Sequence, residues 1–396
     1  MKIAFVTPWY GTDIPGGMES ETRRTAAHLA AAGFEVEVLT TCIRDFFSNW
    51  GTNFHPEGIT VERGVTVRRF RVSGGDQLAF QQANTRLLNR QRLSAAEEAA
   101  FAGEMFQCPD LYMYIAGHCH EYFFFFIPYL YATTIMGATI CPERSILIPC
   151  LHDESYAYLD IFRQIMPQPR AMVLQTRAEL NLVKRLYGPS SSQLRYVIGT
   201  GVDTDFVADA TRFRQKYKLM EPIVLAVGRR DPGKNTPLLL AYWRRYVAES
   251  GTNVKLVLIG PGEIRIDKDV SEHVLDLGFV PLQDKYDAYA AANVLCQPSV
   301  NESFSLVIME AWLTETPVLV NGRCDVTVEH CRRSNGGLYF TNYDEFAATL
   351  DFMLQRESMA RKMGQNGRDY VLANYQWTPI VDRYKQLISE IQDAGK

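Results

Sequence analysis

The chain has 396 residues, of which 47% are hydrophobic and 22% charged, and its formal net charge is −4. This composition is typical of a soluble globular protein and excludes intrinsically disordered and collagen-like classes. At about 150 residues per domain, the length predicts two or three domains. An extended nucleic-acid surface normally needs a basic excess, so we expect no nucleic-acid partner.

The cysteines and the apolar runs bear on location. The eight cysteines include no C-x-x-C pair and no zinc-ligand spacing, so we expect reduced thiols and a cytoplasmic protein. The apolar start of the chain is too short for a signal peptide. Residues 123–140 are nearly uncharged and about 18 residues long, the lower limit for a membrane span. Because this run contains Pro128 and Gly137, we expect a buried helix, with membrane-surface contact as the alternative.

Short β-rich runs alternate with helical segments along the chain. Most runs are continuous Val, Ile and Leu segments, as in parallel strands buried on both faces. We predict strands at 2–7, 36–41, 65–72, 111–116, 145–151, 171–175, 223–227, 255–259, 274–277, 294–297, 317–320 and 337–340. These βαβ units predict an α/β fold with doubly wound sheets.

The pattern restarts near residue 200, which predicts two Rossmann-like domains with a cleft between them. We place the first domain at 1–200 and the second at 201–376. The irregular segment 73–107 contains several arginines followed by Glu97 and Glu98, and we predict an inserted helical arm there. Its polar side chains form either a solvated helix face or a lid that contacts a substrate.

Two loops have the residues that phosphate binding requires. Gly16 and Gly17 separate the first strand from the first helix, so the backbone can approach an anion at a helix N-terminus. Arg229, Arg230 and Lys234 follow the first strand of the second half, at the strand end where open α/β sheets bind ligands. A tight turn and an exposed basic loop are the respective alternatives.

Glu302 and Glu310 stand eight positions apart, across a predicted loop-to-helix boundary. Eight helical residues correspond to about 80° of net rotation, so both side chains lie roughly on one side. The helix N-terminus near residues 303–305 can receive a phosphate, while the carboxylates can accept hydrogen bonds from sugar hydroxyls. A ligand with a diphosphate between two polyol ends would match this arrangement.

Histidines follow two of the predicted strands. His118 and His120 come after the run at 111–116, and His152 precedes Asp153 and Glu154 after the run at 145–151. Because parallel strands end at one edge, we expect all three histidines to face the cleft. Structural roles are the alternative, and a three-histidine metal site would fit no zinc spacing.

Taken in order, these motifs resemble the retaining glycosyltransferases of family 4, the group 1 glycosyltransferases with the GT-B fold. The resemblance covers nearly the whole chain and is strongest from about residue 196 to 340. The matching features are Gly16-Gly17, 199–203 with Phe206, 227–229 with Lys234, 258–262, 277–280, Pro298-Ser299 with Glu302 and Glu310, and Pro317-Val318.

The resemblance implies a nucleotide-diphosphate-sugar donor, with a UDP- or GDP-sugar as the first expectation. Arg229 and Lys234 would bind the diphosphate, Glu310 the ribose and Glu302 the transferred sugar, with backbone near Val280 at the base. The full implied donor set is Gly16, Gly17, Arg229, Lys234, Val280, Glu302, Ser303, Phe304, Ser305, Leu306 and Glu310.

The resemblance further implies transfer of a hexose-type sugar with retention of configuration, without a metal or other cofactor. The first domain would bind a glycan, lipid-linked or small-molecule acceptor for polysaccharide assembly, in the cytoplasm or at the inner face of the membrane. Beside Glu302, the catalytic candidates are His120 and, slightly behind it, His118. The acceptor-side candidates are His152, Asp153 and Glu154. A last helix within 377–396 would return to the first domain.

Three residues depart from the family pattern. Ser305 and Asn235 stand where glycine is usual, and Thr200 replaces an asparagine. The departures at Ser305 and Thr200 motivate an alternative function as a non-catalytic GT-B partner or glycan-binding subunit. A nucleotide-sugar epimerase or a phosphorylase is a more distant alternative.

Overall fold

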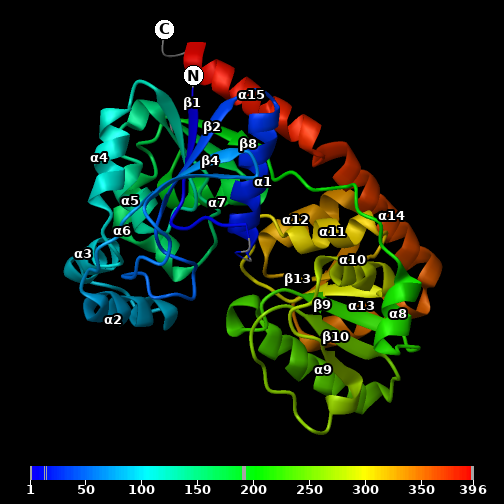
Figure 1. Ribbon diagram of the computed structural model, residues 1–396. Coiled ribbons are helices and arrows are strands. Elements are labelled where there is room, and N and C mark those ends of the chain that lie inside the picture. Colours follow the sequence, from blue (N-terminus) through cyan, green and yellow to red (C-terminus); the bar gives the residue numbers. More distant parts are fainter. Residues whose placement is uncertain (1, 13, 15, 190–192, 394–396) are drawn as a thin grey trace. The chain divides into compact units, whose positions relative to one another are not determined.

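The structure, a computed structural model, describes residues 2–12, 14, 16–189 and 193–393. The chain forms two compact units, each built on one mainly parallel sheet (Figure 1). Unit 1 comprises Met1–Gly201 and Trp377–Lys396, and unit 2 comprises Val202–Gln376. The predicted pair of Rossmann-like α/β sheets is therefore confirmed.

The sheet of unit 1 has eight strands in the order β3-β4-β2-β1-β5-β6-β7-β8. Within the described part of the chain, the edge pair β3–β4 of this sheet is antiparallel and its other neighbouring strands are parallel. The strands are β1 (Lys2–Val6), β2 (Glu35–Thr41), β3 (Gly58–Glu62), β4 (Val65–Phe70), β5 (Tyr122–Phe126), β6 (Ser145–Leu147), β7 (Ala171–Leu174) and β8 (Leu194–Val197).

Helices cover both faces of this sheet: α4, α5 and α6 lie on one side, and α1 and α15 on the other (Figure 1). Side chains alternate accordingly, since Val6 belongs to the same hydrophobic core as Leu111 of α4, whereas Phe125 contacts Tyr384 of α15. The helices are α1 (Gly17–Ala31), α2 (Gln77–Leu88), α3 (Ala95–Gly103), α4 (Pro109–Gly117), α5 (Ala132–Gly137), α6 (Asp160–Ile165), α7 (Arg177–Tyr187) and α15 (Trp377–Asp393). The expected return of the last helix to the first sheet is confirmed.

The sheet of unit 2 has six parallel strands in the order β11-β10-β9-β12-β13-β14. They are β9 (Ile223–Val227), β10 (Lys255–Ile259), β11 (Val274–Asp276), β12 (Val294–Gln297), β13 (Val318–Asn321) and β14 (Gly337–Phe340). The helices are α8 (Ala210–Tyr217), α9 (Thr236–Ser250), α10 (Leu282–Ala291), α11 (Leu306–Leu313), α12 (Asp325–Ser334), α13 (Tyr343–Gln355) and α14 (Glu357–Asn374). All six strands were predicted from the sequence to within one or two residues.

Two predictions for unit 1 are wrong. The run at 111–116 lies in the helix α4, which begins at Pro109 in the first-turn position that proline favours. The run at 123–140 is not one helix, because β5 occupies its start and α5 a later part. Every residue of β5 is buried, so the central strand has the continuous apolar character that we attributed to a buried helix.

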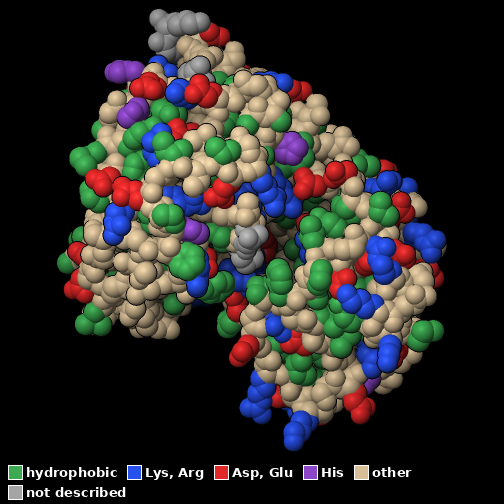
Figure 2. All heavy atoms as spheres, viewed as in Figure 1, with side chains coloured by type: hydrophobic (Ala, Val, Ile, Leu, Met, Phe, Trp, Pro, Cys, Tyr) green, Lys and Arg blue, Asp and Glu red, His purple; other side chains and the backbone are tan. Residues whose placement is uncertain are grey.

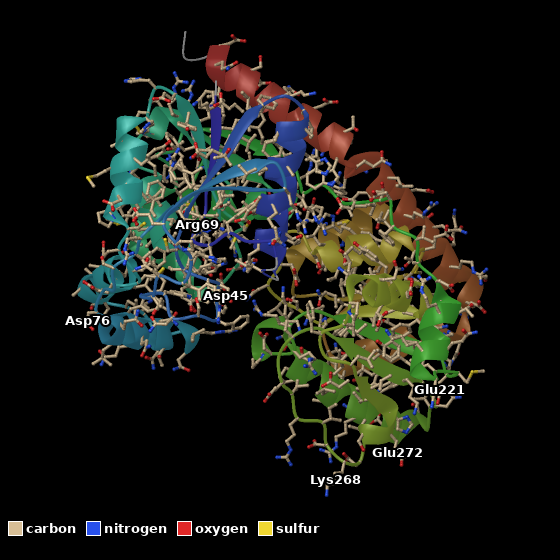
Figure 3. All side chains as sticks on the ribbon, viewed as in Figure 1. Asp45, Arg69, Asp76, Glu221, Lys268 and Glu272 are labelled. Atoms are coloured by element: carbon tan, nitrogen blue, oxygen red, sulfur yellow. A yellow bond between two sulfur atoms is a disulfide. The ribbon has the colours of Figure 1, made fainter. Side chains whose placement is uncertain are left out.

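The segment 73–107 contains α2 and α3, which confirms the predicted helical arm. The side chain of Asp76, labelled in Figure 3, caps α2 by accepting hydrogen bonds from two backbone N–H groups. Ser94 and Glu97 form a capping box at the start of α3. Arg86 of α2 is ion-paired with Glu97, so part of the polar surface of the arm holds its two helices together.

Two of the eight cysteines differ from the expectation of reduced thiols, because Cys119 and Cys141 form a disulfide, whereas the other six are reduced thiols. Their Cα atoms lie 5.8 Å apart although 22 positions separate them, and this proximity comes from the return of the chain after β5. No helix in the described part of the chain is long and apolar enough to cross a membrane. Figure 2 shows acidic and basic side chains interspersed with apolar ones over the surface of both units.

Within unit 1, Gly201 lies directly against Trp377, the first residue of α15. A Cβ atom at this glycine would be only 2.3 Å from the indole ring. The Trp377 ring is also held by α1, because the His28 ring stacks on it with 4.0 Å between the ring centroids. The absence of a side chain at residue 201 is therefore a packing requirement for α15.

We predict that Gly201→Ala destabilises unit 1 by about 1–3 kcal/mol, because the new methyl group overpacks the indole. Differential scanning calorimetry measures the loss as a lower melting temperature. Gly103→Ala, at the last position of α3, is the control, since its Cβ atom would meet no atom within 4 Å. A melting temperature for Gly201→Ala equal to that of Gly103→Ala would contradict the packing argument.

Candidate functional site

The candidate site of unit 2 lies where the strand order changes direction. β9 is the first strand of this sheet and lies between β10 and β12. The loops that leave β9 and β12 therefore separate at their carboxyl ends, the position at which open α/β sheets bind ligands. A small pocket at this point is lined by residues of both loops, including Arg229, Lys234, Gln297 and Pro298.

The loop after β9 orients two cations. Arg229 donates from Nε to Asp231 at 2.8 Å, and the same aspartate caps the short 3₁₀ turn Pro232–Lys234. Asn235 then adopts a left-handed conformation with φ of 58°, which asparagine tolerates better than most residues. Its side-chain amide donates to the carbonyl of Pro298 at 3.0 Å. Asn235 therefore replaces the usual glycine and also ties the β9 loop to the β12 loop.

Glu302 lies in the loop after β12 and is paired with Lys234. The ammonium Nζ is 2.7 Å from Glu302 Oε1, and the carboxylate is only 9% exposed. The side-chain amide of Gln297 donates to the same oxygen at 3.3 Å. Two predicted site residues, Lys234 and Glu302, are therefore in direct contact. Their pairing is expected, since a carboxylate removed from water needs a cation nearby.

The helix α11 begins immediately after this loop. Its N-cap residue, Ser305, has a φ of 70°, a conformation that explains why glycine is usual at this position. The Ser305 hydroxyl is buried without a hydrogen-bond partner among the described residues. Phe304 is buried with its ring against His330 and Tyr375, so its side chain anchors the loop. Ser303 and Leu306 are half-buried at the helix start, where unpaired N–H groups attract anions.

Glu310 lies inside α11 and contacts two residues of α10. Lys285 Nζ is 2.9 and 2.8 Å from its two carboxylate oxygens, and the Tyr289 hydroxyl donates to it at 2.9 Å. Burial, followed by the nearby Glu310 charge, holds the pKa of Tyr289 well above its usual value, so the hydroxyl keeps its proton. Neither Lys285 nor Tyr289 was predicted from the sequence, although their spacing of four residues places them on one helix face.

Val280 is buried in the loop that follows β11.

Arg230, grouped in the sequence with the phosphate-binding cations, has different partners from Arg229. Its guanidinium donates to the carbonyl oxygens of Gly260, at 2.9 Å, and of Gly262, and it is ion-paired with Asp276. Its side chain is 12% exposed, against 42% for Arg229. Arg230 is therefore committed to neighbouring loops.

In unit 1, the glycines before α1 have a local role. Gly16 is the N-cap, and a Cβ atom there would lie 1.9 Å from the carboxylate of Glu19. Glu19 in turn accepts a hydrogen bond from the indole of Trp9 at 2.8 Å. Gly16 therefore makes room for an acid of its own helix. Gly17 is exposed, and no atom lies within 4 Å of its missing side chain.

The expected location of His118 and His120 at a strand's carboxyl end is wrong. Both lie in the turn between α4 and β5, so they precede the amino end of a strand. His118 donates from Nδ1 to the backbone carbonyl oxygen of Tyr114 at 2.7 Å, and its ring stacks on that tyrosine at 3.9 Å. The misassigned strand at 111–116 is the source of the error.

His152, Asp153 and Glu154 follow β6 near its carboxyl end, as predicted. His152 Nδ1 is 3.5 Å from Glu154, and the Tyr129 hydroxyl donates to the same carboxylate at 3.3 Å. Burial would raise the pKa of Glu154, but the hydrogen bonds and charge of His152, with the Tyr129 hydroxyl, lower it. Asp153 is ion-paired with Arg185 at 2.5 Å. Glu154 therefore orients the histidine, whereas Asp153 fixes the loop.

Two buried acids beneath this loop were missed from the sequence. Glu179 accepts hydrogen bonds from the backbone N–H groups of Leu151 and Gln175 at 2.7 and 2.6 Å. Glu21 accepts from the side-chain amide of Gln175, whose carbonyl oxygen accepts from Thr200 at 2.7 Å. Burial raises the pKa of each acid to about 7. Thr200, the third departure from the family pattern, is thus a buried member of this network.

Comparison with known proteins identifies the class of protein that this fold and this site define. The chain is a glycosyltransferase with the GT-B fold. Residues 208–370, which contain the unit 2 site, match the family model "Glycosyl transferases group 1". The matched segment includes Arg229, Lys234, Glu302 and Glu310, the residues whose order carried the resemblance.

Several relatives and solved structures are similar over most of the chain. A D-inositol 3-phosphate glycosyltransferase of Gordonia bronchialis is 26% identical over 400 residues, covering 94% of this chain and 83% of that protein. The structure of a sucrose-phosphate synthase from Thermosynechococcus elongatus matches with a TM-score of 0.72 and 18% identity, covering 99% of both chains. Anabaena HepE, solved with UDP and glucose, matches with a TM-score of 0.70 and 14% identity, covering 98% of this chain and 100% of that chain.

We predict that Lys285→Met destabilises unit 2 by about 3 kcal/mol, because it leaves the buried Glu310 carboxylate without its cation. The melting temperature of unit 2 should fall accordingly. Lys268→Met is the matched control, since Figure 3 shows Lys268 pointing outward from an exposed loop of the same unit. Restoration of stability in Lys285→Met by Glu310→Gln would support the pairing, and equal melting of the two single variants would contradict it.

We also predict that unit 1 loses stability as pH rises from about 5 to 7. Unfolded glutamates ionise near 4.5, whereas burial raises the pKa of Glu21 and Glu179 to about 7, so the unfolded state holds fewer protons in this range. Glu21→Gln should reduce the loss between pH 5 and pH 8 by on the order of 1–3 kcal/mol.

Urea unfolding at the two pH values measures this difference. Glu143→Gln serves as the control, because that side chain is 84% exposed in the same unit. It should retain the pH dependence of the unsubstituted protein. If Glu21→Gln kept the full pH dependence as well, the assignment of a raised pKa to Glu21 would be wrong.

Proposed function

We propose that the protein is a retaining, metal-independent glycosyltransferase that transfers a hexose-type sugar from a UDP- or GDP-sugar. The acceptor is a hydroxyl of a glycan, a glycolipid or a small molecule. The names of similar proteins support both donor classes, since one relative is a GDP-mannose-dependent mannosyltransferase and one solved structure contains UDP and glucose.

One observation carries the proposal. Arg229, Lys234 and the N-terminus of α11 gather at the carboxyl ends of β9 and β12, and Glu302 lies among them. The two cations and the helix N-terminus suit a diphosphate. The positive charge of this group offsets the negative charge of a leaving diphosphate, which supports transfer without a metal.

The carboxylates then bind the two polyol ends of the donor. Glu302 accepts hydrogen bonds from hydroxyls of the transferred sugar, and Glu310, oriented by Lys285 and Tyr289, accepts them from the ribose. The backbone near Val280 meets the base. Lys234 contacts Glu302 in the structure, and its ammonium has further hydrogens with which to bind a phosphate oxygen.

In the proposed reaction, the incoming acceptor oxygen and the leaving diphosphate lie on the same face of the sugar. The acceptor oxygen forms a bond to the anomeric carbon as the bond from that carbon to the diphosphate oxygen breaks. The acceptor proton passes to an oxygen of the departing diphosphate. The products are a nucleoside diphosphate and a glycoside with the configuration of the donor. The protein contributes positioning and charge stabilisation of the leaving group.

We assign acceptor binding to unit 1, with His152 as the main polar candidate. The Glu154 carboxylate beside Nδ1 orients the imidazole in the way that functional histidines commonly require. Asp153 is ion-paired with Arg185 and is assigned a structural role. His118 and His120 precede β5, so we propose no catalytic role for them.

The three departures from the family pattern have local structural explanations. Asn235 and Ser305 adopt left-handed conformations, and Thr200 belongs to a buried hydrogen-bond network. None of the three removes a cation or carboxylate from the site. No specific observation therefore favours the non-catalytic alternative.

The test is release of nucleoside diphosphate from a panel of UDP-, GDP-, ADP- and dTDP-sugars with glycan and small-molecule acceptors. We predict that Glu302→Gln lowers kcat/KM by about a hundredfold or more, because a preorganised group of the site is lost. Glu249→Gln is the control, since this 54% exposed glutamate lies on α9, away from the pocket. Activity should survive EDTA.

Three outcomes would contradict the proposal at different points. Full activity of Glu302→Gln would remove its assigned role, and loss of activity in EDTA would remove metal independence. Absence of both turnover and donor binding across the panel would favour the non-catalytic alternative. The anomeric configuration of the product, read by NMR, tests retention.

A further inference from the structure

Arg230 connects three loops at the carboxyl edge of the unit 2 sheet. It follows β9, and its side chain reaches the loops after β10 and β11. Its Nε donates to the Gly260 carbonyl at 2.9 Å, Nη2 donates to the Gly262 carbonyl, and Nη1 is ion-paired with Asp276. Its backbone N–H also donates to the carbonyl of Pro261 at 2.8 Å. A planar guanidinium with several donors is suited to such a junction.

Asp276 extends this junction to the next loop. The carboxylate oxygen that pairs with Arg230 also accepts the backbone N–H of Gly278 at 3.1 Å. The carbonyl of Gly278 in turn accepts from the backbone N–H of Gly260 at 2.8 Å. One ion pair thus fixes the start of the segment Gly278-Phe279-Val280 relative to the β10 loop.

The glycines in these loops allow this close approach. A Cβ atom at Gly260 would lie 1.9 Å from the carbonyl oxygen of Gly228, and one at Gly262 would lie 3.2 Å from that of Arg230. Both glycines have positive φ values, 141° and 111°. Strands β9, β10 and β11 are neighbours in the sheet, so the three loops form one layer on the side away from β12.

We infer that Arg230 and Asp276 form a positioning pair that shapes the nucleobase end of the donor site. The inference rests on the proposed function, in which the backbone near Val280 meets the base. A base is recognised by backbone N–H and C=O groups only if their directions are fixed, and this ion pair fixes the loop that carries them. Arg230 is therefore a positioning residue for the nucleoside, whereas Arg229 and Lys234 act on the diphosphate.

Charge and exposure separate these two roles. The Arg230 guanidinium is largely buried and its charge is balanced by Asp276, which is 22% exposed. Three of its five N–H donors are engaged by two carbonyls and this carboxylate. Loss of Arg230 should consequently weaken binding of the base more than binding of the phosphates.

The experiment measures binding of UDP, GDP and inorganic pyrophosphate by isothermal titration calorimetry. Arg230→Met and Asp276→Asn should weaken the nucleoside diphosphate preferred by the unsubstituted protein by about ten- to a hundredfold. Their affinity for pyrophosphate should stay within about threefold of the unsubstituted protein. Arg230→Lys should not restore the affinity, because an ammonium cannot form the same planar set of hydrogen bonds.

The chain offers a matched control pair. Arg244 is bonded to Asp269 at 2.6 Å, and both side chains are about half exposed on the same unit. Arg244→Met and Asp269→Asn should leave all three affinities unchanged. Since Arg230 and Asp276 act as one unit, the double variant should bind the nucleotide no more weakly than the weaker single variant. Circular dichroism and melting temperatures establish that each variant is folded.

The outcomes distinguish the inference from the proposed function. If the unsubstituted protein bound neither nucleotide nor pyrophosphate, the proposed function and the inference would both fall. If it bound UDP or GDP and Arg230→Met bound equally well, only the inference would be overturned. An equal loss for nucleotide and pyrophosphate in folded Arg230→Met and Asp276→Asn would also overturn it, because the pair would then support the whole site without selectivity.

Discussion

All six strands of the unit 2 sheet run parallel, and this constraint determines where the unit can bind a ligand. Every loop that leaves a strand's carboxyl end emerges at the same edge, so residues distant in sequence meet there. The resulting crowding is resolved by residues with positive φ, such as Gly260, Asn235 and Ser305. It is also resolved electrostatically, because Glu302 and Glu310, each less than a tenth exposed, are both paired with a lysine.

The fold of unit 2 could be predicted from the sequence because its strands are short Val, Ile and Leu runs separated by clear helices. Unit 1 was harder for a physical reason. Its central strand β5 is made of aromatic residues buried on both faces, and periodicity alone does not distinguish such a run from a buried helix. Conversely, residues 111–116 of α4 form a short continuous apolar run, which periodicity alone does not assign to a helix or a strand, and Pro109 marks the helix start.

The candidate site was likewise only partly predictable from the sequence. The cations and carboxylates that belong to recognisable local motifs, such as Lys234 and Glu302, were predicted and lie in contact. Their supporting partners were not, because nothing local marks them. Lys285 meets Glu310 across 25 positions, and Arg230 meets Asp276 across 46. Such pairings depend on how neighbouring strands and helices return to one edge, which a sequence without its topology does not specify.

Unit 1 is discontinuous in sequence, since α15 packs on α1 after the whole of unit 2 has intervened. During synthesis, the ribosome completes unit 2 before it reaches Trp377, so unit 2 can fold while unit 1 still lacks one of its layers. Until then, Phe125 lacks its contact with Tyr384, and the ring of His28 lacks Trp377. The nascent chain therefore exposes an apolar face of its first sheet for the time taken to translate about 175 residues, an interval in which chaperone binding would protect it from aggregation.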